Sequence, residues 1–98
     1  NVGGTGTNSI SLASAAGGIT LATHSTKVVT ISGGDLVPGA DGTLDLGGAS
    51  RRWANIYTGD LHLKNERGDW TIVEEEDYLT IVNNKKGKKY KFVLEEID

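Results

Sequence analysis

Three segments near the C-terminus alternate apolar and polar residues, and they limit what this chain can fold into. They are residues 70–73, 78–82 and 89–94. Asn83–Gly87 joins the second to the third and has the Asn and Gly residues that supply positive φ in hairpin loops. The alternation and the loop predict a three-stranded antiparallel meander.

The expected register places the large apolar side chains of this meander on one face. The predicted cross-strand partners are Ile81 with Tyr90, Leu79 with Phe92, Trp70 with Ile81, and Ile72 with Leu79. A single sheet with a bare apolar face is not stable in water. The chain has no amphipathic helix to cover that face. Three copies with their faces inward would close a triangular prism, so we predict a homotrimer, and a back-to-back dimer meets the same constraint.

The first fifty residues have a different composition from the rest. They contain 11 of the 14 glycines but only four charged residues, whereas the remaining 48 contain 19 charges and all six aromatic residues. Three short alternating segments, residues 10–12, 19–21 and 29–31, are separated by glycine pairs that indicate turns. These segments predict strands of a thin shaft that pair across chain boundaries, and a flexible Gly/Ser/Thr linker is the alternative.

Stabilisation of so small a chain also favours oligomers. Hydrophobic residues make up 37% of the sequence, and cysteine is absent, so neither a large core nor a disulfide is available. The predicted fold class is all-β. An intertwined homotrimeric β shaft over residues 1–40 is followed by a small C-terminal head over residues 41–98, with a three-stranded antiparallel meander in each chain.

The junction between the halves has its own pattern. Residues 43–46 predict a strand, a glycine turn follows, and Trp53, Ile56 and Tyr57 have the spacing of one short helical turn or bend. Leu61 and Leu63 predict a further strand. The residues predicted to form the trimer core are Leu44, Leu46, Trp53, Ile56, Tyr57, Leu61, Leu63, Trp70, Ile72, Leu79, Ile81, Tyr90, Phe92 and Leu94.

The segment TLDLGGASRRWANIYTGDLHL, residues 43–63, closely resembles the D-L-G-x-x-x-R-x-W/F-x-x-I/L-Y motif common in phage tail fibres and tailspikes. Residues 63–97 are similar to the C-terminal end of fibre-like proteins of phages, especially marine cyanophages. The resemblance covers residues 35–98. It implies a homotrimer in the virion, a β-rich shaft that joins other tail proteins, and a receptor-facing tip.

The function implied by this resemblance is that of a structural virion fibre segment involved in host-cell attachment. A structural component of the baseplate, collar or capsid that binds no receptor is the alternative. The chain departs from the family in having no recognisable self-cleaving chaperone domain. The absence of Met predicts that the chain does not begin at its own start codon, and residues 95–98 are expected to be a natural terminus.

One basic cluster is the candidate ligand-binding surface. Its members are Lys85, Lys86, Lys88, Lys89 and Lys91, and the first four are the candidate ligand-facing residues. These residues are expected to face a host surface glycan or lipopolysaccharide, since phosphate groups attract lysine clusters. The simpler interpretation is a charged hairpin tip that keeps the fibre soluble.

No pattern of catalytic residues is present, so we expect neither enzyme activity nor a metal or cofactor site. His24 and His62 lack the spacing of metal ligands, and the acidic run at 74–77 predicts a solvated turn. Ser50 has no nucleophile elbow around it. The net charge of −3 disfavours nucleic acid as a partner, and no apolar run reaches the roughly 18 residues that membrane insertion needs.

Overall fold

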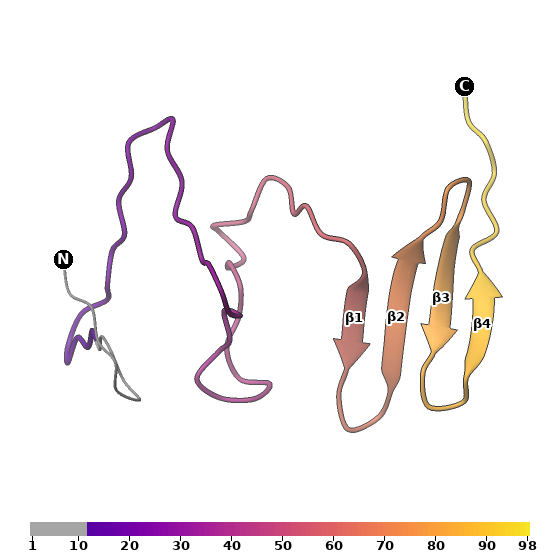
Figure 1. The fold of residues 1–98 in the computed structure, drawn as a ribbon, viewed down its shortest axis with the longest axis horizontal. Coiled ribbons are helices and arrows are strands. Elements are labelled where there is room, and N and C mark those ends of the chain that lie inside the picture. Colours follow the sequence, from indigo (N-terminus) through magenta and orange to yellow (C-terminus); the bar gives the residue numbers. More distant parts are fainter. Residues whose placement is uncertain (1–11) are drawn as a thin grey trace. The chain divides into compact units, whose positions relative to one another are not determined.

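The computed structural model describes residues 12–98, and in that range the protein is all-β, with no helix. The chain forms two units, Asn1–Val37 and Pro38–Asp98. The second unit contains one antiparallel sheet with the strand order β1-β2-β3-β4. Its strands are β1 (Leu61–Lys64), β2 (Asp69–Glu74), β3 (Leu79–Asn83) and β4 (Lys88–Lys91), joined by short loops as Figure 1 shows.

The sheet has one strand more than the predicted three-stranded meander. The strand expected around Leu61 and Leu63 is present as β1, and it pairs with β2 instead of belonging to the junction. A tight turn over Asn65–Gly68 makes this pairing available. The Asn65 side-chain oxygen accepts hydrogen bonds from the backbone N–H groups of Arg67 at 2.8 Å and Gly68 at 3.1 Å.

The loop between β3 and β4 is the predicted hairpin loop. The Gly87 N–H donates to the Asn83 carbonyl at 2.8 Å, and Gly87 has a φ of +65°. That left-handed conformation is accessible to glycine without the steric cost that a Cβ brings. No non-glycine residue in the described range has a positive φ, so the two asparagines do not contribute it as predicted. Asn83 instead accepts a side-chain hydrogen bond from the Lys86 N–H at 3.2 Å.

The register of the sheet confirms one half of the predicted pairing and corrects the other. Ile81 lies opposite Tyr90, and the Phe92 N–H donates to the Leu79 carbonyl at 3.0 Å, as expected. Between β2 and β3 the predicted register is wrong by two residues, because Ile72 lies opposite Ile81 and Trp70 lies opposite Asn83.

The cause of the shift is the loop at Glu75–Tyr78. Its Glu75 N–H donates to the Tyr78 carbonyl at 2.8 Å, which closes the turn one residue later in the chain than the predicted pairing places it. The displaced turn adds the pairs Val73–Thr80 and Glu74–Leu79. A two-residue shift leaves every side chain on its predicted face, since strand side chains repeat with a period of two.

The first unit shows turns but no strands over its described residues. The predicted strands at 19–21 and 29–31 are not formed within one chain, and the segment at 10–12 lies mostly outside the described residues. A strand needs a neighbouring strand that pairs with its backbone hydrogen-bonding groups, and no other described segment of this unit supplies one. The expected glycine turn is present at Gly33, where φ is +88°. Pairing of these segments between chains stays a prediction.

The junction folds back on itself over a few residues. The predicted strand at 43–46 is wrong, because Thr43 belongs to a turn and the only local pairing is between Gly48 and Arg51. Gly47, at a φ of +85°, lies under Trp53, and a Cβ there would come within 3.2 Å of the indole ring. The expected helical turn is a bend at Ala54.

Candidate functional site

One face of the sheet carries nearly all of its large apolar side chains. This apolar face consists of Leu61, Leu63, Trp70, Ile72, Leu79, Ile81 and Tyr90. Leu61 and Leu63 are each 48% exposed, and Tyr90 is 47% exposed. No hydrophobic side chain is buried anywhere in residues 12–98. The apolar face is therefore formed but not covered within the part of the chain that the structure describes.

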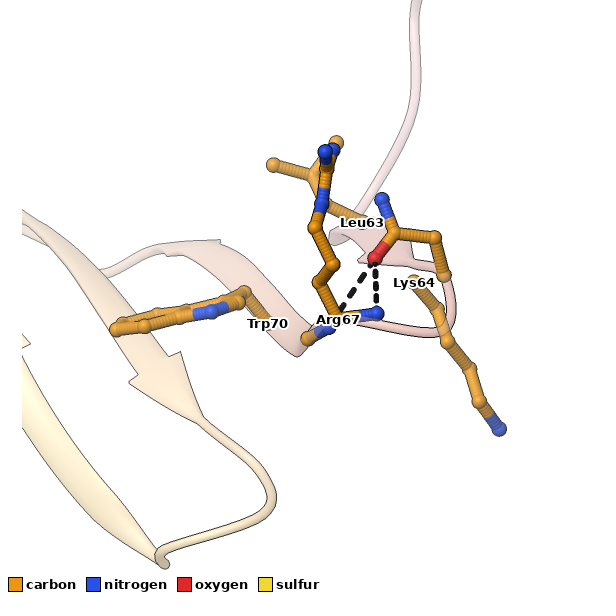
Figure 2. Close-up of a pocket in the computed structure, with 6 residues that line it drawn as sticks. Leu63, Lys64, Arg67 and Trp70 are labelled. Atoms are coloured by element: carbon orange, nitrogen blue, oxygen red, sulfur yellow. Dashed lines mark hydrogen bonds between the residues drawn. The ribbon is translucent and has the colours of Figure 1, made fainter.

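Aromatic side chains organise the apolar face near the β1–β2 turn. The rings of Trp70 and Tyr90 lie 6.2 Å apart between centroids and are tilted by 34°. Trp70 also lies over Gly68, where a Cβ would come within 3.1 Å of the indole nitrogen. Figure 2 shows the shallow hollow beside this ring, with Arg67 on its rim and the Lys64 side chain extending away from Trp70.

The opposite face is polar, and it contains the only two buried residues in the described range, Thr71 and Thr80, at 7% and 3% exposure. The Asn84 side-chain amide donates to the Thr71 hydroxyl at 2.9 Å and to an Asp69 carboxylate oxygen at 3.0 Å. The Thr71 hydroxyl also lies 3.1 Å from His62 Nδ1. These hydrogen bonds tie β1, β2 and the β3–β4 loop together and satisfy this face within one chain.

The two ends of the sheet carry opposite charge. We call the β1–β2 and β3–β4 turns, with the adjoining strand ends, the basic end. Its cationic residues are Lys64, Arg67, Lys85, Lys86, Lys88 and Lys89, and its carboxylates are Glu66 and Asp69. The acidic end is the β2–β3 turn with its run of four carboxylates, residues 74–77. The predicted solvated acidic turn is confirmed, since three of the four carboxylates are exposed.

Seven of the predicted core residues lie outside the strands. Trp53, Ile56 and Tyr57 belong to the segment before β1, where Tyr57 is 94% exposed, and Leu94 follows β4. Leu44 and Leu46 lie near the Gly47 turn, and both are exposed. Phe92 directly follows β4 and is half-buried. The structure thus brings seven of the predicted residues together on one face and leaves the junction residues separate from it.

The two histidines belong to different units of the chain. His24 Nδ1 lies 3.3 Å from the Thr26 hydroxyl in the first unit, and His62 contacts Thr71 on the polar face. Within residues 12–98, no group of three or more His, Cys, Asp or Glu side chains is arranged to hold a metal ion. No helix in the described range has the length and apolarity to cross a membrane.

Comparison with known proteins gives no identification. No family model, no curated protein and no solved structure matches this chain.

The sequence did not predict the polar network. Asp69 and Asn84 are 15 positions apart, and Asn84 was expected only as a loop residue. The two meet because the register places Trp70 opposite Asn83, which brings the Asn84 N–H within 2.8 Å of the Asp69 carbonyl. The only sequence signal for this network would have been the correct position of the β2–β3 turn.

Replacing Thr71 with Val tests whether the polar network stabilises the sheet. Thr71→Val keeps the shape of the side chain but removes the hydroxyl that bonds Asn84 and His62. We expect the free energy of unfolding to fall by about 1 kcal/mol, as measured by urea denaturation. Thr58→Val is the matched control, because the exposed Thr58 hydroxyl makes one long bond of 3.4 Å, and its effect should stay within about 0.5 kcal/mol. Equal effects of the two substitutions would contradict the role of the network.

Proposed function

We propose that this chain is a structural segment of a virion tail fibre that assembles as a homotrimer and contributes to host-cell attachment. Two observations support the proposal. The first is the resemblance of residues 35–98 to tail fibre proteins. The second, which carries the oligomeric part, is an apolar face of seven large side chains that no described part of the chain covers.

The two faces of the sheet differ in how much burial and hydrogen bonding they have within one chain. This difference supports the apolar face as the one that contacts other copies. Thr71 and Thr80 are buried and hydrogen-bonded within one chain, so the polar face gains little from a partner. The apolar face differs, because completing the burial of a half-exposed Leu or Ile stabilises by roughly 1 kcal/mol. Glu74 and Lys88 lie on the same face, one at each end of the sheet. Their charges would therefore stand at the two edges of a core formed by this face.

Three copies and two copies both cover the apolar face. In a threefold arrangement with parallel copies, the three basic ends lie at the same end of the assembly, and like charges repel there. An antiparallel dimer would instead place each basic end beside an acidic one. The resemblance to trimeric fibres favours three copies. A dimer is the outcome that would replace the proposed trimer.

The proposed mechanism is mechanical and multivalent. The proposal includes no catalytic step, and the described residues contain no group of three or more His, Cys, Asp or Glu arranged to hold a metal ion. Three identical heads on one fibre would bind repeated groups on a cell surface with an avidity above that of one head.

Two neighbouring substitutions in β3 test which face forms the interface. Ile81→Lys places a charge on the apolar face, and Val82→Lys places the same charge on the polar face at the next residue. Both positions are half-buried in the single chain, which makes them a matched pair. We expect Ile81→Lys to abolish the oligomer, because a buried unpaired ammonium costs several kcal/mol, and Val82→Lys to keep it. Size-exclusion chromatography with light scattering gives both masses, and loss of the oligomer only in Val82→Lys would contradict the assignment.

Labelling of virus particles tests the fibre function. Antibodies raised against the 98-residue chain and marked with gold should decorate tail fibres on particles of the phage whose genome encodes it. Label at the baseplate, collar or capsid would replace the proposal with the structural component that binds no receptor. Absence of label on intact and on disrupted particles would contradict a virion role.

A further inference from the structure

The two hairpin tips at the basic end form one continuous surface. The Lys85 ammonium donates to the Arg67 carbonyl at 3.3 Å, which connects the β3–β4 loop to the β1–β2 turn. The Asn84 backbone N–H donates to the Asp69 carbonyl at 2.8 Å, and the Asn84 side chain also bonds Asp69. These bonds cross from one tip to the other, so the cationic side chains stand on a connected scaffold.

The charge of this surface is strongly positive. The basic end contains six cationic side chains and only two carboxylates. One of these carboxylates, Asp69, accepts a hydrogen bond from the Asn84 amide. All six cationic residues are exposed. The excess contrasts with the chain as a whole, whose net charge is −3, and with the four carboxylates at the acidic end. The sheet thus presents one attractive end to an anionic partner and repels it at the other.

The basic end is also the free end of the sheet. In a four-stranded meander, the entry to the first strand and the exit from the last lie at the end of the β2–β3 turn. Leu61 begins β1 and Lys91 ends β4, and Figure 1 shows both at that end, away from the two basic tips. The segments that enter β1 and leave β4 therefore do not pass through the two basic tips.

We propose that the basic end binds an anionic polysaccharide whose phosphate groups are spaced along neutral sugars. This inference names the ligand class of the proposed attachment function and rests on that function. Lysine ammonium groups on flexible stems suit such a ligand, because they act as point charges without a fixed geometry. A nucleic acid has a phosphate on every nucleotide, and a strand extending past this small surface would meet the carboxylates of an otherwise acidic protein.

The threefold arrangement strengthens the inference. Three parallel copies place three basic ends at the same end of the assembly, where their mutual repulsion opposes trimer formation. A polyanion that bridges these ends would relieve the repulsion, and any ligand that binds only the assembled state stabilises it. Ligand binding and trimer stability are therefore coupled at this surface.

The experiment uses the full 98-residue chain and immobilised dextran phosphate, with unmodified dextran and a single-stranded oligonucleotide as the comparison ligands. The test variant is Lys86→Gln with Lys89→Gln, two exposed lysines of the basic end. The matched control is Lys27→Gln with Arg52→Gln, which removes the same charge from exposed positions outside the basic end. The solution mass of every sample is measured alongside, so that loss of assembly is separated from loss of binding.

We expect the chain to bind dextran phosphate and not dextran, with affinity falling as salt rises. The test variant should bind about tenfold more weakly and show a smaller salt dependence, while the control stays within about twofold. Dextran phosphate should also raise the melting temperature of the trimer. A trimeric chain that fails to bind, or that loses affinity equally in both variants, would overturn this inference alone. Tighter binding of the oligonucleotide would assign the surface to nucleic acid, and a monomeric chain would overturn the proposed function beneath it.

Discussion

The apolar face of the sheet is the constraint on which the rest of the structure depends. Its seven side chains are aligned by the β-ladder, but no hydrophobic side chain becomes buried within residues 12–98. A folded domain normally offsets the entropy cost of ordering its chain by burying apolar surface. In the proposed trimer other copies would supply that contribution, and folding and assembly are then expected to be a single event.

The two faces of the sheet divide stability between the chain and the assembly. On the polar face, Asn84 joins Asp69 and Thr71, and these bonds stabilise within one chain the register of β2 against β3 that the turn sets. The same bonds hold the two basic tips side by side. Assembly through the apolar face would then present three such surfaces in parallel. The local hydrogen bonds set the shape of the sheet, and in the proposed trimer the hydrophobic contacts between copies would supply most of its stability.

Much of the sheet could be predicted from the sequence, because alternation assigns side chains to faces whatever the register. The face of Ile72 and Ile81 was correct although their partners between β2 and β3 were not. The β2–β3 register could not be predicted, since the turn at Glu75–Tyr78 is closed by backbone groups that leave little trace in residue types. The predicted strand at 43–46 was wrong for another reason. A short alternating segment forms a strand only when a neighbouring strand pairs with its backbone, and here Thr43 lies in a turn.

The basic surface shows what the structure adds to a sequence pattern. Lysines at 85, 86, 88 and 89 are visible in the sequence, but Lys64 and Arg67 join them only through the pairing of β1 with β2. Residues far apart in the chain thus form one charged end, which a linear pattern cannot reveal. The junction residues Trp53, Ile56 and Tyr57 belong to no such cluster in the single chain, and their core role stays a prediction.

Sedimentation equilibrium of the unmodified chain tests the central claim most directly. The account predicts a mass three times the 10.4 kDa of one chain, constant over a wide range of protein concentration. A mass of two chains would replace the threefold closure with the dimer. A folded chain with the mass of one would contradict the account, because its apolar face would then be stable in water without a cover.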